Sequence, residues 1–509
     1  MSATRSIADL PGPPRLLLLG NAHQLRVSRM HLIAEEWARR YGPIVGVKLG
    51  ARRTVVYLSD PDEIHRILRE RPAGFRRQRA TEMVLREMAG NGSLPPPGVF
   101  LAEGDEWKRQ RRLVVSALNA NHLRRYFDVV RTSAERLHRR LTGAAGEGRP
   151  IEIGRELTSY TIDTISALAF GHDLNTLERG EVELQRHIQR ILQMTTRRVA
   201  MPVPYWRWVR LPADRALDRS TAALDAAVEG FIEQARRRMA ARPELHDQPE
   251  NLLEAMLAAQ EGDDGEARFT DEEIVANART IISAGEDTTA HTLSWTVWLL
   301  ASRPDIQARI AAETDVVLGE APFPGGHETV AGLTYCEGVI REALRLKTPT
   351  PLLALEPLLD TTICDTRIPA GTRLLLLLRE ANRQREGSPD EFDPQRWLGS
   401  ESEAAAKSLT FGARPALLSG AQPRLPRGDQ RARDDRPQLR NRAGSVRPPG
   451  QGAFRLHDVP GGPVRASATA RRGSVMTGAR ARLKARRVVR RRAPRSRRRT
   501  SSRSARGAA

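Results

Sequence analysis

The feature that most constrains the fold of this chain is a change in composition directly after Ala413. Residues 414–509 contain 27 basic and four acidic residues, so this tail carries a net charge of +23. The whole chain carries +21, so residues 1–413 carry about −2. No apolar periodicity continues past Ala413, and Gly, Pro and Arg dominate there, a composition typical of disorder. We therefore predict a folded region over residues 1–413 and a disordered tail over residues 414–509.

Residues 1–413 are numerous enough to bury a large core. Ile44–Leu49 and Thr54–Leu58 read as a pair of strands, and Leu353–Leu378 as further strands. Between Ile151 and Leu300 helical spacing dominates, and Thr270-Asp271-Glu272-Glu273 is a capping box that opens a long helix. The expected fold class is mainly α with a small β-rich subdomain.

The chain contains only two cysteines, Cys336 and Cys364, so no disulfide framework is predicted. The longest apolar runs, Leu16–Leu19 and Leu374–Leu378, are far shorter than the roughly 20 residues that cross a bilayer. Met1–Leu10 has no apolar signal region. We expect a cytoplasmic protein that does not associate with a membrane.

The most unusual motif inside the predicted long helix is Ala284-Gly285-Glu286-Asp287-Thr288-Thr289. Gly and paired Thr disfavour a helix interior, whereas small residues let a flat ligand approach the backbone. A Thr hydroxyl can bond the carbonyl one turn earlier and open the helix locally. A neighbouring acid can then carry protons from solvent to a bound, reduced oxygen species. A glycine that only packs against another helix, beside solvated acids, is an equally good interpretation of this stretch alone.

Three other motifs are weak in isolation. Glu342 and Arg345 form an acid–base pair at helical spacing, which is usually a solvated surface pair. Arg396 lies in an aromatic loop segment that could be an ordinary surface turn. Trp107 and Arg111 share one face of a basic helix and could bind a carboxylate, or could simply be exposed.

The order and spacing of these motifs, ending at Phe411-Gly412, resemble those of the cytochrome P-450 haem-thiolate monooxygenases over about residues 10–413. The resemblance implies the cytochrome P-450 fold and haem b (iron protoporphyrin IX) as cofactor. It implies that Asp287 and Thr288 are the acid–alcohol pair of the oxygen-activating helix, and that Ala284 and Gly285 lie against the haem. It also implies the roles of two further groups of residues. Trp107 and Arg111 would bind the haem propionates, and Glu342, Arg345 and Arg396 would form a buried structural triad.

The chain departs from the family pattern at the metal ligand. In this family the loop after the Phe-Gly pair contains the cysteine whose thiolate binds the iron, which favours O–O cleavage. Here the chain continues Arg414-Pro415-Ala416-Leu417-Leu418, and no cysteine follows Cys364. The expected ligand position falls at Leu418.

A shift of reading frame accounts for this departure. Codons can be written for residues 416–425 that, read one base later, encode Arg-Phe-Cys-Pro-Gly-Arg-Asn-Leu-Ala, with the Cys codon spanning Leu418 and Ser419. In the same phase, Phe454–Gly462 reads Ser-Ala-Phe-Thr-Met-Phe-Pro-Glu, which resembles a late strand hairpin of the family. We therefore expect one extra base directly after the Ala413 codon, either in the gene or in its sequencing.

Three functions follow as hypotheses. The first is haem-dependent hydroxylation of a lipophilic substrate by O2, with electrons from a separate redox partner of the ferredoxin or flavodoxin type and its reductase. The second is an inactive relative that lacks the thiolate. The third is non-specific nucleic-acid binding through tail clusters such as Arg490-Arg491-Arg492. The tail has no Tyr or Trp for base stacking, and out-of-frame arginine needs no selected partner, so no specific nucleic-acid partner is expected.

Overall fold

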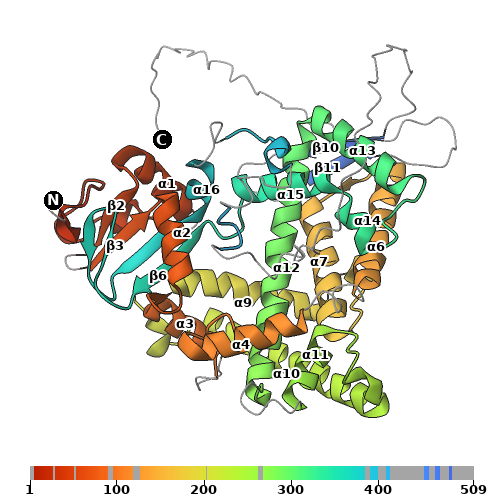
Figure 1. Ribbon diagram of the computed structural model, residues 1–509, viewed down its shortest axis with the longest axis horizontal. Helices are drawn as coiled ribbons and strands as arrows, with labels where there is room; N and C mark the ends of the chain where they lie inside the picture. Colours follow the sequence, from red (N-terminus) through yellow and green to blue (C-terminus); the bar gives the residue numbers. More distant parts are fainter. Residues whose placement is uncertain are drawn as a thin grey trace, which may run out of the picture.

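The computed structural model describes residues 5–412 apart from gaps at 27–28, 51–52, 90–95, 119–125, 181, 202, 262–267, 385–389 and 399–407. Beyond residue 412 it describes only the strands at 452–457, 465–469 and 481–483. A small β-rich part lies at one side of the molecule, and the larger remainder is helical (Figure 1). The fold class expected from the sequence is therefore confirmed.

The helical part is built around one long central helix, α12 (Asp271–Ala301), which runs through the middle of the molecule (Figure 1). Its predicted capping box is present. The Thr270 backbone N–H donates to Glu273 at 3.0 Å, and the Glu273 N–H donates to the Thr270 hydroxyl at 3.2 Å. Helices α4, α7, α10 and α11 contribute to a shared apolar core with α12. The helices that surround α12 are α4 (Gly104–Ala117), α6 (Phe127–Glu147), α7 (Ile153–Phe170), α8 (Thr176–Arg179), α9 (Glu183–Ala200), α10 (Pro212–Ala241), α11 (Leu252–Glu261), α13 (Pro304–Leu318), α14 (His327–Ala331) and α15 (Thr334–Leu346).

The β-rich part is a five-stranded sheet in the order β2-β3-β9-β6-β4. Its strands are β2 (Ile44–Leu49), β3 (Arg53–Leu58), β4 (Phe75–Arg77), β6 (Leu352–Pro357) and β9 (Arg373–Leu377). Residues Leu374 and Leu376 face one apolar core with helix α2 (Pro61–Glu70), whereas Leu375 and Leu377 face another with α1 (Met30–Tyr41). Burial on both faces explains why this strand reads as an unbroken apolar run. Helix α3 (Arg79–Ala89) follows β4, and α16 (Leu378–Gln384) follows β9.

Two smaller sheets complete the described fold. One has the order β1-β8-β7, formed by β1 (Arg5–Ser6), β7 (Thr361–Ile363) and β8 (Thr366–Ile368). The other has the order β12-β10-β11-β5, formed by β5 (Pro150–Ile151), β10 (Gly452–His457), β11 (Arg465–Thr469) and β12 (Ala481–Leu483).

The second small sheet contains strands from the basic tail. Strands β10 and β11 pair antiparallel, and β11 pairs with β5 of the helical part. We predicted disorder for all of residues 414–509, whereas the structure describes the strands β10, β11 and β12 in this region. Backbone groups alone make such pairs, so a segment without an apolar pattern can still supply them. The remainder of the tail, including Leu418 and Arg490-Arg491-Arg492, lies outside the described residues.

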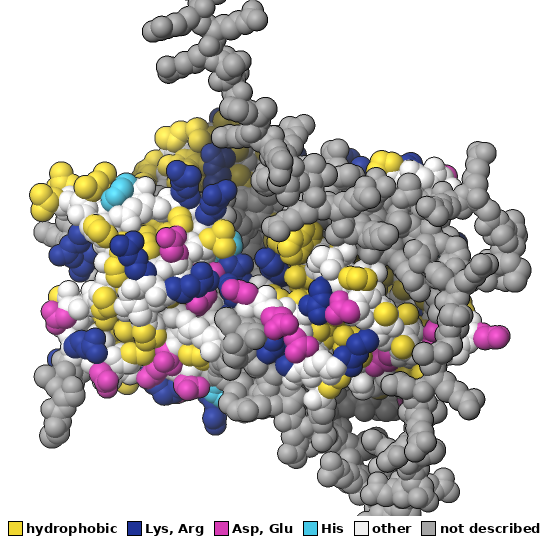
Figure 2. All heavy atoms as spheres, turned by 90° about the horizontal axis from the view of Figure 1, so that it is seen from above, with side chains coloured by type: hydrophobic (Ala, Val, Ile, Leu, Met, Phe, Trp, Pro, Cys, Tyr) yellow, Lys and Arg dark blue, Asp and Glu magenta, His cyan; other side chains and the backbone are white. Residues whose placement is uncertain are grey.

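Charges of both signs are interspersed on the surface. On the face seen in Figure 2, basic and acidic side chains alternate among apolar ones. This agrees with the small net charge of residues 1–413 and with the large number of surface ion pairs between single Arg and Glu or Asp residues.

Candidate functional site

One face of α12 is exposed at the middle of the helix. Ala284, Asp287, Thr288 and His291 are spaced by three, four and seven residues, so they share this face, and all four are exposed. The side chains of Asp287 and His291 are 52% and 57% exposed. The neighbours Ile282, Glu286 and Ala290 are buried on the opposite side. The structure therefore brings Ala284, Asp287 and Thr288, three of the predicted site residues, together on one open face.

The predicted back-bond of Thr288 is present. Its hydroxyl donates to the Ala284 carbonyl oxygen at 2.8 Å. Helix α12 is nevertheless continuous from Asp271 to Ala301, so the bond does not open the helix. Thr280 and Thr292 make the same bond to the carbonyl four residues earlier. What distinguishes Thr288 is its place beside Asp287 on the exposed face.

Gly285 lies toward a neighbouring helix. A Cβ atom added to Gly285 would stand 2.8 Å from Cγ1 of Ile165, which belongs to α7. A larger side chain would push the two helices apart, because interiors are closely packed. This contact agrees with the packing interpretation of the glycine, and the predicted contact of Gly285 with haem stays a prediction.

Asp287 has a partner that sequence reasoning missed. Nδ1 of His291 lies 3.0 Å from Oδ1 of Asp287 and 2.8 Å from the Asp287 carbonyl oxygen. The hydrogen bond to the Asp287 carboxylate raises the pKa of His291, against the opposing effect of burial. The i, i+4 spacing of an acid and a histidine was visible in the sequence and could have indicated this pair.

This raised pKa has a testable consequence. Since His291 binds its proton more tightly in the folded chain, the pair stabilises the fold fully below the ordinary histidine pKa of ~6.5. That contribution disappears as the pH rises through the folded pKa. We expect NMR titration to give His291 a pKa above ~6.5, and Asp287→Asn to lower it. Glu272→Gln, in the first turn of α12, is the control. An unchanged His291 pKa in Asp287→Asn would contradict the pairing.

The predicted pair on α4 also shares a face. The Arg111 guanidinium lies over the Trp107 ring, 5.2 Å from its centroid. Helix α4 is held against the start of α12 by side chains that the sequence did not single out. The Asn277 amide donates to the Gln110 side chain at 3.1 Å, and Gln110 donates to Glu273 at 3.2 Å. The binding of haem propionates by Trp107 and Arg111 stays a prediction.

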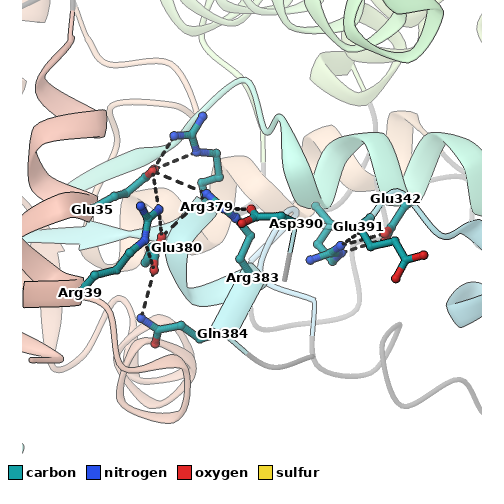
Figure 3. Close-up of polar contacts among 10 residues, drawn as sticks. Glu35, Arg39, Glu342, Arg379, Glu380, Arg383, Gln384, Asp390 and Glu391 are labelled. Carbon is teal, nitrogen blue, oxygen red and sulfur yellow. Dashed lines mark hydrogen bonds and ion pairs between the residues drawn. The ribbon is translucent and has the colours of Figure 1, made fainter. Parts of the chain in front are cut away.

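The third predicted group is a buried ionic network around Glu342. Its side chain is fully buried and accepts hydrogen bonds from Arg345 at 2.9 and 2.8 Å and from Arg396 at 3.0 Å. Trp397, in the short helix Pro394–Trp397, also donates its indole N–H to Glu342 at 2.8 Å. Figure 3 shows Glu342 on α15 beside Glu391, whose carbonyl accepts from Arg345 at 2.9 Å. The surface interpretation of Glu342 and Arg345 is thus excluded.

A second ionic network was not predicted at all. It joins α1 to α16 through two ion pairs, each of which contains two hydrogen bonds (Figure 3). Arg379 donates to Glu35 at 2.8 and 2.5 Å, and Arg39 donates to Glu380 at 3.1 and 2.7 Å. The partners are more than 340 residues apart in the chain, so no local pattern could have indicated them.

Neither cysteine lies in the loop that carries the iron ligand in this family. Burial and the Glu313 carboxylate raise the pKa of Cys336 to about 12, and burial with nearby acids raises that of Cys364 to about 12. In the absence of a metal both thiols are therefore protonated near neutral pH, and it is their places in the fold that set them apart from the loop after Phe411-Gly412. Cys336 lies in the first turn of α15, and Cys364 in the turn between β7 and β8. The residues present do not supply the thiolate that this kind of haem site needs.

Comparison with known proteins identifies the family. The sequence model of the cytochrome P450 family matches residues 10–415. The chain is 28% identical to mouse mitochondrial 25-hydroxyvitamin D-1 alpha hydroxylase over 81% of this chain and 82% of that protein. It is 27% identical to cyclooctat-9-en-7-ol 5-monooxygenase of Streptomyces melanosporofaciens over 79% and 82%. The crystal structure of the cytochrome P450DA heme domain shares the fold, with a TM-score of 0.67 at 24% identity over 79% of this chain and 85% of that chain.

The chain belongs to the cytochrome P450 family. This membership places the chain in the oxidoreductase class of haem-dependent monooxygenases, whose members use O2, a redox partner and a lipophilic substrate. The family match ends two residues past Ala413, where the composition changes. Among the helices of the described residues, none has the length and apolar character that a membrane span requires.

Proposed function

We propose that the protein encoded in the corrected reading frame hydroxylates a lipophilic organic molecule. Its electrons would come from a separate redox partner of the ferredoxin or flavodoxin type with its reductase. The protein would be located in the cytoplasm. The observation that carries the proposal is the open face of α12, on which Asp287 and Thr288 stand side by side. The two relatives named above, one a hydroxylase and the other a monooxygenase, support the same class of reaction.

In this proposal each residue has a limited task. Asp287, exposed to solvent and paired with His291, exchanges protons with water and passes them to the Thr288 hydroxyl. Ala284 keeps the face beside Thr288 free of bulk. Trp107 and Arg111 hold the carboxylates of the cofactor, and the Glu342 network holds the core behind it. Haem supplies oxygen activation when it is bound through a thiolate.

The corrected frame is part of the proposal, because the printed sequence cannot supply that thiolate. Strand β10 overlaps the stretch Phe454–Gly462, whose alternative frame resembles a strand hairpin of the family. If the given sequence is the true reading frame, the protein is instead an inactive relative that lacks the thiolate.

Substitutions can separate the proposed proton-transfer roles of Asp287 and Thr288 from a role in helix packing. In the frame-corrected enzyme, Asp287→Asn and Thr288→Ala are each expected to lower substrate turnover by ~10²-fold or more, the usual contribution of a positioned proton donor. Thr292→Ala removes the same back-bond one turn later and should leave turnover unchanged. Turnover is measured with a ferredoxin and its reductase. Equal losses in Thr288→Ala and Thr292→Ala would overturn the assignment.

A further inference from the structure

A turn of four leucines projects from the outer end of the five-stranded sheet. Leu16, Leu17, Leu18 and Leu19 are 51%, 97%, 82% and 56% exposed, so two of the four side chains lie almost wholly in solvent. This end of the sheet is at the left edge of the molecule in Figure 1, where the N-terminal segment lies beside β2 and β3. Single exposed leucines are common on protein surfaces, whereas contiguous ones mark a surface that contacts a partner.

Backbone contacts hold this turn in place. Leu16 and Gly20 exchange two hydrogen bonds, at 3.0 and 2.9 Å, which close the turn. Gly20 also forms a β-bridge with Leu49 at the end of β2, and its φ of +59° favours glycine. A Cβ atom on Gly20 would stand 2.4 Å from the Lys48 carbonyl oxygen, so this close approach to the strand requires glycine. The leucines are therefore presented to solvent by a hydrogen-bonded turn that is joined to the sheet.

Two further exposed leucines lie at the same end of the sheet. Leu358 and Leu359 follow β6 directly and are 42% and 78% exposed. The registers of the pairs β2–β3, β3–β9 and β9–β6 place the end of β6 and the turn between β2 and β3 at one end of the sheet. Three strand spacings, roughly 15 Å, separate β2 from β6. This end of the sheet therefore carries two groups of exposed leucines.

The chain segments that meet at the leucine turn carry only positive charge. Residues 10–34 and 42–59 contain no acidic residue, and their basic residues are Arg15, Arg26, Arg29, Lys48, Arg52 and Arg53. The side chains of Arg15 and Arg53 are exposed, and neither forms an ion pair with an acid of the described residues. At the second group of leucines, Asp360 pairs with Arg367 at 3.0 Å. Within these segments the leucines of the turn are therefore accompanied by cations alone.

Projecting leucines beside unpaired cations match the surface of an anionic lipid bilayer. Apolar side chains that enter the boundary between headgroups and acyl chains bind in proportion to the apolar area that they bury. Basic residues near the surface are attracted to anionic headgroups, which are abundant in the cytoplasmic leaflet of cell membranes. A fluid interface accepts a projecting apolar turn directly, whereas a protein partner must offer a complementary pocket.

We propose that the Leu16–Leu19 turn, together with Leu358 and Leu359, docks the protein on an anionic lipid bilayer. The leucines enter the acyl boundary, and Arg15 and Arg53 lie at the headgroups. The expectation of no membrane association considered only segments that could cross a bilayer or direct secretion, so it did not test contact with the surface. The inference does not rest on the proposed monooxygenase function, because neither haem nor the reading frame after Ala413 contributes to this surface.

Sedimentation of the full chain with lipid vesicles tests the proposal. One set of vesicles contains phosphatidylcholine alone, and the other an equimolar mixture of phosphatidylcholine and phosphatidylglycerol. Replacing both Leu17 and Leu18 by Gln is expected to lower the partition coefficient on the mixed vesicles by ~10-fold or more. Replacing both Arg15 and Arg53 by Gln should weaken binding only to the vesicles that contain phosphatidylglycerol. Val316→Gln is the control and should change nothing, since Val316 is 86% exposed on α13, away from the sheet (Figure 1).

A local measurement separates the turn from the basic tail, whose arginines also attract anionic lipid. An environment-sensitive dye attached to the Leu18→Cys variant is expected to gain fluorescence when vesicles are added. The same dye attached to the Val316→Cys variant should show no change. The parent chain, labelled in the same way, gives the signal that comes from Cys336 and Cys364.

Each other outcome overturns the proposal. Equal partition of the parent chain and the leucine double variant means that the tail or another surface binds the lipid. Failure of the parent chain to bind vesicles means that no lipid-docking surface exists. A dye on Leu18→Cys that does not respond to vesicles shows that the turn stays in water. A leucine double variant that changes the oligomeric state but not vesicle binding assigns the turn to a second copy of this chain.

Discussion

Removal of one base directly after the Ala413 codon is expected to convert a chain that cannot hold haem through sulfur into one that can. The corrected frame places Arg-Phe-Cys-Pro-Gly at positions 416–420, two residues after Ala413, and replaces the arginine-rich tail. A cysteine in that loop would supply the axial thiolate, whereas Cys336 lies in the first turn of α15 and Cys364 in the turn between β7 and β8. The expected effect is all or none.

The carbon-monoxide difference spectrum of the reduced protein measures this effect. The corrected protein should show the band of thiolate-bound haem, and the printed chain should not. The matched control is the corrected protein with Ser in place of the new cysteine, which keeps the corrected tail and loses only the sulfur. If that control gives the same band, the ligand is not this cysteine. Resequencing of the gene across Gly412–Gly420 tests the frame directly.

Replacement of Glu342 by Gln is expected to produce the largest loss of stability of any substitution considered for this chain. Glu342 neutralises two nearly buried guanidinium groups, since the side chains of Arg345 and Arg396 are only 3% and 11% exposed. Removing one partner of a buried ionic network leaves uncompensated charge and costs roughly 3–5 kcal/mol. Trp397 and the Asp393 backbone N–H, at 2.8 and 3.1 Å, lose part of their acceptor as well.

Urea denaturation gives the free energy of unfolding for this comparison. Glu337→Gln is the control, because Glu337 lies one and a half turns earlier on α15 and pairs with Arg341 while 58% exposed. An exposed pair of this kind contributes at most about 1 kcal/mol. If Glu342→Gln and Glu337→Gln cost the same, the network does not stabilise the fold as its burial indicates.

Much of the local structure was predictable because its causes are local. The capping box at Thr270 and the start of α2, where Pro61 follows the Asp60 N-cap, depend on residues within one turn of each other. The strand pair β2–β3 depends on alternation along short segments. Such signals do not require knowledge of what lies across the fold.

The candidate site was predictable only in part. The motif order located Asp287, Thr288, Glu342 and Arg345, but Trp397 and His291 entered as partners only in the structure. The Gln110–Asn277 bond and the Glu35–Arg379 pair join residues separated by 167 and 344 positions. Side chains that meet across such distances leave no spacing in the sequence.

The sequence by itself determined the family, the boundary after Ala413 and the absence of a cysteine after Cys364. Those conclusions follow from residue types and their order along the chain. Only the tertiary structure decided that the Glu342 side chain is fully buried and that the Asp287 side chain is 52% exposed. The periodicity of a helix or strand shows which residues share a face. What covers that face depends on elements that the chain brings together from far apart.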